Sequence, residues 1–137
     1  MSTEQNKKVV EEYFECLNER DANRLAGLLT ETFTWVLPVR ASALAQMAVP
    51  RNKRESLERI KAIFASMRDK PQMKPFAWTA EGDRVAVESE GHIVWNNGKP
   101  FNCLYHHAFV LRDGKIDKCT EYLDFLYVWE THPLVQR

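Results

Sequence analysis

Three glutamates and two histidines in the second half of the chain are the residues best suited to acid–base chemistry. Glu88, Glu90 and His92 alternate along one predicted strand, and His107 and Glu121 lie on the next two predicted strands. Carboxyl and imidazole groups transfer protons near neutral pH. Alternate residues of a strand point to the same face of a sheet. Whether all five groups meet therefore depends on how the strands pair.

Turn sequences between the strands set that pairing. Asn97-Gly98 is typical of a two-residue hairpin turn, and residues 112–114 suit a three-residue loop that ends in glycine. The Asn97-Gly98 turn predicts that Cys103 pairs with His92, Tyr105 with Glu90 and His107 with Glu88. The loop at 112–114 predicts that Tyr105 pairs with Glu121, His107 with Cys119 and Phe109 with Asp117. One face of three adjacent strands then carries Glu88, Glu90, His92, Tyr105, His107, Phe109, Cys119 and Glu121.

The opposite face of the predicted sheet is mostly apolar. It carries Val85, Val87, Ile93, Trp95, His106, Ala108, Val110, Ile116 and Tyr122. An exposed apolar face needs a cover, and a second copy of the chain is the simplest one. We therefore expect a homodimer through Ile93, Trp95, His106, Val110 and Tyr122. The polar face must then point inward, and since unpaired buried charges are costly, its glutamates are expected to line a cavity.

The elements that position these residues change period half-way along the chain. Helical spacing of apolar residues begins after Ser2, after Asp21 and after Asn52, and Ser2 and Asn52 have capping-box spacing to a glutamine and a glutamate. Strands are predicted at 33–37, 73–79, 85–95, 101–111 and 115–123, and a final segment, 125–130, is expected to cover one edge of the sheet. Helices followed by a strand meander indicate the α+β class.

Composition narrows the possible partners. The 137 residues carry 19 basic and 19 acidic side chains, so the formal charge is zero and nothing indicates a nucleic-acid or anionic-membrane partner. The three cysteines are widely spaced, which favours reduced thiols in the cytoplasm, and the N-terminus does not resemble a signal sequence. No glycine-rich nucleotide loop is visible, and we expect no cofactor. The length predicts a single domain, 1–137.

Residues 9–38, which include VVEEYFECLNERDANRLAGLL and FTWVLP, and residues 109–126, FVLRDGKIDKCTEYLDFL, carry a family resemblance. The chain resembles the nuclear transport factor 2-like superfamily, in particular its ketosteroid isomerase and SnoaL-like (polyketide cyclase) branch. This resemblance implies a cone-shaped, curved antiparallel sheet wrapped on three N-terminal helices, a cystatin-like α+β barrel. It also implies a small-molecule pocket, although the superfold carries many reactions and some non-catalytic modules.

Departures from the family pattern bear on the reaction. Leu37 stands where ketosteroid isomerases have their aspartate base, while Tyr13 matches their oxyanion-binding tyrosine and His107 replaces their protonated aspartic acid. The two aspartates of limonene-epoxide hydrolases match Glu90 and Glu121, but their arginine matches Glu88, and their water-binding tyrosine and asparagine match Thr34 and Val36. The resemblance therefore implies neither classical steroid isomerisation nor that epoxide-opening water site.

These observations predict a cofactor-independent acid–base enzyme for a small, largely apolar cyclic metabolite, acting as an isomerase, cyclase, dehydratase or epoxide hydrolase. Glu90 and Glu121 are the expected acid and base, and His107 is expected to donate to a substrate oxygen. The predicted substrate-binding residues are Tyr13, Trp35, Trp78, Glu88, His92 and Tyr105.

Other interpretations of the same residues stay open. His107 can be a hydrogen-bonded core residue, Glu88 can neutralise a histidine, and the aromatic residues can be core. The histidines and glutamates can also bind zinc or iron, although we expect no metal. The alternative function is a non-catalytic ligand-binding or dimerisation module of the same fold.

Overall fold

A computed structural model describes residues 1–135 and contains a single five-stranded sheet. The helices are α1 (Thr3–Glu19), α2 (Ala22–Ala26), the 3-10 helix η1 (Ser42–Leu44), α3 (Lys53–Ala65) and α4 (Phe125–Thr131). The strands are β1 (Leu29–Val36), β2 (Gln72–Glu81), β3 (Arg84–Val94), β4 (Pro100–Arg112) and β5 (Lys115–Tyr122). The predicted helices and strands are all present, with boundaries that differ by a few residues.

Local sequence explains where the two long helices begin. Ser2 and Gln5 form a reciprocal capping box at the start of α1, and Asn52 and Glu55 form another at the start of α3. Each box satisfies backbone N–H groups that have no partner within the helix. Both boxes confirm the sequence prediction. Asp124 similarly caps α4 by accepting a hydrogen bond from the backbone N–H of Tyr127.

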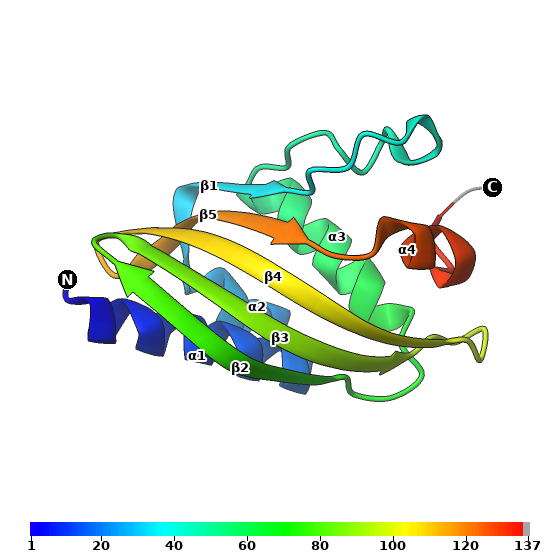
Figure 1. The fold of residues 1–137 in the computed structure, drawn as a ribbon, viewed down its shortest axis with the longest axis horizontal. Coiled ribbons are helices and arrows are strands. Elements are labelled where there is room, and N and C mark those ends of the chain that lie inside the picture. The colour runs from blue at the N-terminus through cyan, green and yellow to red at the C-terminus, as the bar shows by residue number, and fades with distance from the viewer. Residues whose placement is uncertain (136–137) are drawn as a thin grey trace.

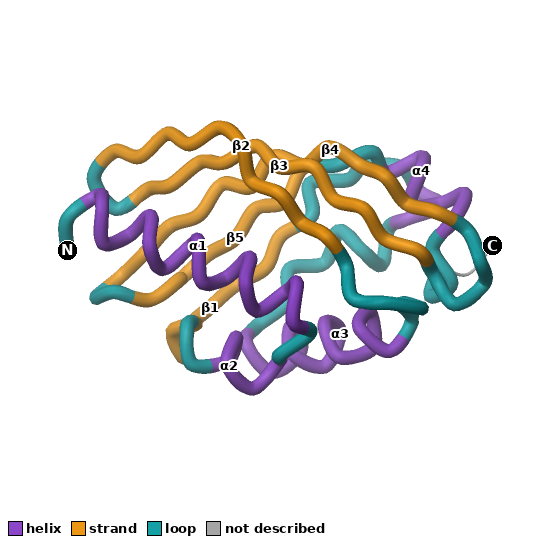
Figure 2. Tube along the Cα trace, turned by 90° about the horizontal axis from the view of Figure 1, so that it is seen from below, coloured by secondary structure: helices purple, strands orange, loops and turns teal. Residues whose placement is uncertain are grey.

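The sheet is curved and has the order β1-β5-β4-β3-β2. Neighbouring strands are antiparallel, except that β1 runs parallel to β5. Figures 1 and 2 show α1, α2 and α3 on one face of the sheet, which we call the inner face, and α4 at one end. The main apolar core lies between this face and the helices. The predicted α+β class, with a curved sheet on N-terminal helices, is confirmed.

The pairing of β3 with β4 differs by one residue from the sequence prediction. The backbone of Trp95 bonds that of Gly98 and that of Lys99, at 2.9 and 3.0 Å, so the connection is a three-residue loop. Gly98 has a φ of 82°, which this loop type requires at its last position. Ser89 therefore lies opposite Tyr105.

This one-residue difference reverses every side chain of β3. Glu88 and Glu90 are exposed on the outer face of the sheet, and His92 lies there with them. The prediction that these three residues point inward is wrong. Their places on the inner face are taken by buried residues, namely Val85, Val87, Ser89, Gly91, Ile93 and Trp95.

The pairing of β4 with β5 also differs; Ile116, predicted on the outer face, is buried in the core, but the faces of the later residues of β5 are as predicted. Asp113 and Gly114 both have positive φ, 51° and 78°, and form a two-residue turn instead of the predicted three-residue loop. The register then shifts by one more residue beyond Leu111. His107 consequently pairs with Glu121, not with Cys119. The shorter turn and the register shift each move the pairing of β5 by one residue. Together they move it by two residues, which is one full side-chain period, so every side chain of β5 beyond the shift keeps its predicted face.

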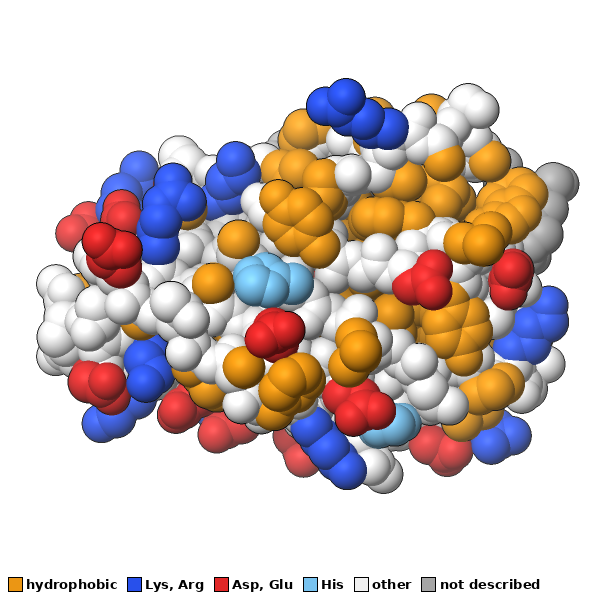
Figure 3. All heavy atoms as spheres, in the orientation of Figure 1, with side chains coloured by type: hydrophobic (Ala, Val, Ile, Leu, Met, Phe, Trp, Pro, Cys, Tyr) orange, Lys and Arg blue, Asp and Glu red, His pale blue; other side chains and the backbone are white. Residues whose placement is uncertain are grey.

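No helix covers the outer face of the sheet, which faces the viewer in Figure 1. Exposed Leu104 and Tyr122 lie on it, and Figure 3 shows apolar side chains gathered there among charged ones. Ile93 and Trp95 were predicted on this face, but both are buried on the inner face, which corrects that part of the expected dimer surface. Within residues 1–135, no helix has the length and apolar character needed to cross a membrane.

His106 and His107 test the assignment of faces, since they are neighbours on β4 and point to opposite sides. His107 is fully buried, whereas His106 is exposed. We expect His107→Ala to lower the free energy of unfolding by about 3 kcal/mol, because it leaves a cavity and removes a buried hydrogen bond. His106→Ala should change it by less than about 0.5 kcal/mol. Urea unfolding followed by circular dichroism measures both; equal effects would contradict the register.

Candidate active site

An apolar cavity of about 110 Å³ lies between the inner face of the sheet and helices α1, α3 and α4. This inner cavity is large enough for several water molecules or part of a small organic molecule. Most of its wall is aliphatic or aromatic and includes Leu17, Leu37, Met47, Ile60, Phe64, Met73, Ile93 and Phe101. The polar side chains in the wall are few, as is typical of small-molecule sites.

Glu121 supplies the carboxylate of the inner cavity. It comes from β5, and one of its oxygens, Oε1, lies 2.9 Å from Nε2 of His107 on β4. The side chain of Glu121 is 15% exposed, whereas that of His107 has no exposed surface. The carboxylate thus lines the cavity while the imidazole lies behind it and fixes its position. A carboxylate accepts hydrogen bonds, so Nε2 carries the proton of this bond.

Aromatic rings enclose His107 on all sides that the cavity does not reach. Its ring stacks between those of Tyr105 and Phe109, each with a centroid distance of 5.6 Å. The rings of Tyr13 and Phe14 approach it at 6.1 and 5.5 Å in edge contacts. Its second nitrogen, Nδ1, is buried without a hydrogen-bond partner within residues 1–135. His107 therefore holds Glu121 but does not line the cavity, and the prediction that it donates to a substrate oxygen is not supported by its position.

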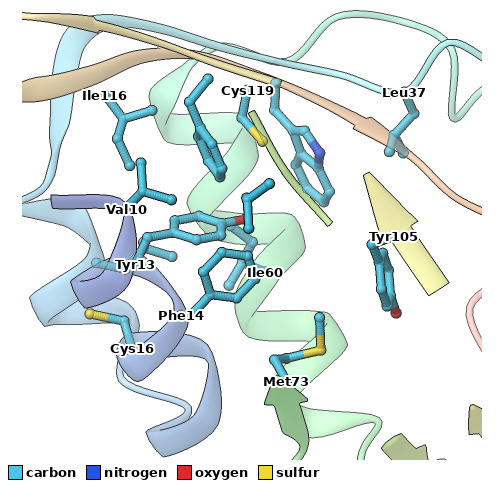
Figure 4. Packing of buried hydrophobic residues seen from close by; sticks show 14 of the residues in the cluster. Val10, Tyr13, Phe14, Cys16, Leu37, Ile60, Met73, Tyr105, Ile116 and Cys119 are labelled. Carbon is cyan, nitrogen blue, oxygen red and sulfur yellow. The ribbon is translucent and has the colours of Figure 1, made fainter. Parts of the chain in front are cut away.

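Two tyrosines present hydroxyl groups to the inner cavity. Figure 4 shows Tyr13 reaching in from α1 and Tyr105 from β4. Burial raises the pKa of both phenols well above the usual value of 10.0, and the nearby negative charge of Glu121 raises them further. Both side chains consequently remain hydroxyl donors at physiological pH. The Tyr13 hydroxyl is hydrogen-bonded to the sulfur of Cys119, while no bond is made by that of Tyr105 within residues 1–135.

Gly91 gives Tyr105 the space that it occupies. A Cβ atom at Gly91 would lie 2.8 Å from Cε1 of the Tyr105 ring and 2.6 Å from the sulfur of Met73. Any larger residue at this point on the inner face of β3 would displace the ring or the thioether. The absence of a side chain therefore helps to set the shape of the cavity wall.

Two tryptophans of the same wall have indole nitrogens without a hydrogen-bond partner among residues 1–135. Trp35 of β1 and Trp95, directly after β3, both line the inner cavity. The indole nitrogen of each is buried and has no acceptor within the part of the chain that the structure describes. An unpaired buried donor costs about 1–3 kcal/mol, so these N–H groups suit a ligand that carries acceptor oxygens. No group of three or more His, Cys, Asp or Glu side chains within residues 1–135 is arranged to hold a metal ion.

Comparison with known proteins agrees with this fold of a curved sheet packed on helices. The SnoaL-like domain family matches residues 10–118. The chain belongs to this family. No curated protein sequence matches it significantly.

Solved structures of the same fold are similar to this SnoaL-like protein along almost its whole length. An NTF2-like protein of unknown function from Burkholderia pseudomallei has a TM-score of 0.80 at 16% identity and covers 100% of both chains. TerC, co-crystallised with polyporic acid, has a TM-score of 0.78 at 16% identity over 92% of this chain and 96% of its own. An LEH-like epoxide hydrolase from M. tuberculosis has a TM-score of 0.74 at 15% identity, over 93% and 89%. These identities establish a shared fold.

The structure of this SnoaL-like protein brings only part of the predicted site together. Tyr13, Trp35, Tyr105 and Glu121 line the inner cavity, and His107 supports Glu121 from behind. Trp78 is absent from the cavity wall and packs edge-on against Phe14, with ring centroids 6.4 Å apart.

Glu88, Glu90 and His92 take no part in the cavity. On the outer face His92 lies 2.9 Å from the side-chain oxygen of Asn102 and 3.5 Å from the carboxylate of Glu90. Glu90 therefore cannot act together with Glu121, and the predicted pair of carboxylates is wrong. Glu88 is not the neutralising partner of His107 either, since Glu121 has that place.

Sequence reasoning missed several residues of the cavity wall. Met47 lies in the uncharged segment 41–50, whose composition does indicate a cover over an apolar surface. Val128 and His132 reach the cavity from α4 and the residue after it. Arg59 of α3 follows no motif, and only the packing of α3 against the sheet places it at the cavity.

The buried acids predict that stability falls in alkaline solution. Burial raises the pKa of Tyr13, Tyr105 and Cys119 in the folded protein, whereas in the unfolded chain the tyrosines titrate near 10.0 and the cysteine near 9.0. Above pH 9 the unfolded chain therefore loses protons that the folded protein keeps. The free energy of unfolding should fall by up to about 1.4 kcal/mol per pH unit for each group.

Denaturant unfolding at a series of pH values from neutral to alkaline measures this slope. Replacing both tyrosines, Tyr13→Phe with Tyr105→Phe, should make the alkaline slope shallower, because two of the three titrating groups are removed. The stability of the double variant at neutral pH serves as the reference. An unchanged slope in the variant would contradict burial as the cause.

Proposed function

We propose that this protein is a cofactor-independent acid–base enzyme that transfers protons on a small, largely apolar cyclic metabolite bound in the inner cavity. The observation that carries the proposal is the position of Glu121, a carboxylate in the wall of an otherwise apolar cavity, held by His107 at 2.9 Å. A cavity that only binds apolar molecules gains nothing from a carboxylate in its wall, because the charge must be desolvated when the ligand enters.

The other polar groups of the wall are hydrogen-bond donors, which can stabilise the oxygen that becomes negative when the substrate loses a proton. When Glu121 removes a proton from the carbon next to a carbonyl group, the electron pair moves to the carbonyl oxygen, which becomes an enolate. The Tyr105 hydroxyl and the unpaired indole N–H groups of Trp35 and Trp95 are donors for that oxygen. Return of the proton to another carbon isomerises the substrate. Alternatively, the enolate carbon attacks a second carbonyl carbon of the same molecule, which closes a ring, and the proton passes from Glu121 to the oxygen of that carbonyl group.

Carbonyl chemistry fits these residues better than epoxide opening does. Opening an epoxide with water requires side chains that hold and activate the water molecule. Thr34 and Val36, which the family resemblance matches to the water-binding tyrosine and asparagine of epoxide hydrolases, do not line the inner cavity. Leu37 lines the cavity where a ketosteroid isomerase has its base, so Glu121 must carry the proton instead.

Exchange of carbon-bound protons for deuterium tests the proposal without knowledge of the natural substrate. β-Tetralone, an apolar bicyclic ketone, is incubated in deuterium oxide with the protein, and loss of the proton signal next to the carbonyl is followed by NMR. We expect the wild-type protein to accelerate exchange and Glu121→Gln to reduce that acceleration by at least about 100-fold. Glu90→Gln is the matched control, since its carboxylate lies on the outer face.

Equal loss of exchange in both variants, or no loss in Glu121→Gln, would contradict the assignment of Glu121. If the wild-type protein binds β-tetralone without accelerating exchange, the alternative function applies, and the cavity is a binding site in a non-catalytic module. The thermal unfolding midpoint of each variant shows whether the fold is retained.

We also propose that two copies of the chain pair through the outer face of the sheet. Leu104, His106, Val110 and Tyr122 give this face an apolar strip that no helix covers. Exposed Glu90 lies opposite Lys74 beside the strip, so both signs of charge are present, as a surface that pairs with itself requires. Such a pairing would bury the strip on both copies at once.

Two leucines of equal exposure test this pairing. Leu104 on the outer face and Leu126 on α4 are each 66% exposed. Size-exclusion chromatography with light scattering should give a dimer for the wild-type protein and for Leu126→Asp. Leu104→Asp should give a monomer, because the dimer would have to bury a charge. A wild-type monomer, or a dimer that survives Leu104→Asp, would contradict the proposed surface.

A further inference from the structure

Two partly buried arginines lie together beside the inner cavity. Arg51 precedes α3, and Arg59 is in the second turn of that helix. Burial lowers the pKa of both guanidinium groups, and the positive charge of Arg51 lowers that of Arg59 further. Two like charges that are both partly removed from water raise each other's free energy unless an anion is bound between them.

Within residues 1–135 no carboxylate forms an ion pair with either guanidinium group, although the charge of Glu121 acts on Arg51 from a distance. Within residues 1–135, the Arg59 guanidinium makes no hydrogen bond or ion pair. The Arg51 guanidinium donates to the backbone oxygen of Met47 at 3.4 Å and lies over the Trp35 ring at 5.3 Å. Glu55 influences Arg51, but its carboxylate is exposed and accepts from the backbone of Asn52 as part of the α3 cap.

Several more exposed arginines of the same chain have carboxylate partners. Arg54, three residues along from Arg51, pairs with Glu58 at 2.9 Å. Arg24 pairs with two glutamates at 2.8 and 2.9 Å, and Arg112 pairs with Asp117 at 3.3 Å. A partly buried charge needs a partner more than an exposed one does, so the lack of a carboxylate at Arg51 and Arg59 in the described chain is costly. Unpaired, partly buried arginines indicate a site for an external anion.

The arginines line a second hollow that shares part of its wall with the inner cavity. Arg51 and Arg59 line a second hollow, which we call the outer hollow, next to η1. Arg59 and Met47 line the inner cavity and the outer hollow at once. Trp35 connects them a second time, since its ring lines the inner cavity and also lies against Arg51. The shared wall places both guanidinium groups close to a ligand that is bound in the inner cavity.

We propose that the molecule bound in the inner cavity carries a carboxylate group, which Arg51 and Arg59 bind in the outer hollow. The inference rests on the proposed function for the location of the ligand and adds its chemical class, an amphipathic organic acid with an apolar ring system. A planar carboxylate matches the hydrogen-bonding fork of a guanidinium group. Its single negative charge, with that of the Glu121 carboxylate, balances the two arginines.

A pair of probes that differ only in charge tests the proposal. β-Naphthoate and β-naphthamide have the same ring system and nearly the same shape, and isothermal titration calorimetry measures the affinity of each. We expect the wild-type protein to bind the naphthoate at least about tenfold more tightly. Arg59→Gln and Arg51→Gln should remove this preference and leave the affinity for the naphthamide unchanged.

Matched variants separate a binding role from a structural one. Arg54→Gln, on the same helix but exposed, should keep the full preference for the naphthoate. Arg59→Lys keeps the charge and should retain part of the preference. Equal affinities of the two probes for the wild-type protein, or binding of neither, would overturn the proposal. So would a loss of preference in Arg54→Gln as large as that in Arg59→Gln.

The result can be read independently of the proposed catalytic step. If Glu121→Gln fails to change proton exchange while the preference for the naphthoate is present, the catalytic assignment is wrong and the anion site stands. If exchange depends on Glu121 but the wild-type protein shows no preference, the anion site is wrong and the catalytic assignment stands.

Discussion

The register between β3 and β4 is the constraint on which the rest of the structure depends. A strand has a side-chain period of two, so the loop between these strands decides which half of β3 is buried. The loop at residues 96–98 has three residues because Gly98 adopts a positive φ of 82° and completes a bulge. The valines of β3 consequently face the helices and its glutamates face outward. The alternative register would bury two more carboxylates and expose the aliphatic residues.

With one internal carboxylate, the cavity can be both apolar and chemically active. Several buried carboxylates would repel one another, and each would need its own partner. Glu121 needs only His107, whose ring is held between Tyr105 and Phe109. The hydrogen bond orients the carboxylate, and the aromatic rings orient the imidazole. The hydroxyl and indole donors of the wall then remain available to a ligand.

The cavity and the outer hollow together give the site two different chemical halves. The inner part offers apolar surface around Glu121, and the outer part offers the guanidinium groups of Arg51 and Arg59. The two parts belong to segments far apart in the chain, since β5 carries the carboxylate and the start of α3 carries the arginines. An amphipathic ligand could be oriented by this division, with its ring at the carboxylate and its charged end at the arginines.

The sequence by itself determined what is local in this protein: the helices after Ser2 and Asn52, begun by capping boxes, and the change to strands after residue 71. It also determined that Tyr13 points into the fold, since the period of a helix is enough for that, whereas Glu121 keeps its predicted face only because two differences in strand pairing cancel. Only the tertiary structure decided that Glu90 lies outside and Arg59 beside the cavity. The physical reason is that one residue in a loop reverses a whole strand, and that packing between distant elements, which no short sequence pattern encodes, selects the residues that meet.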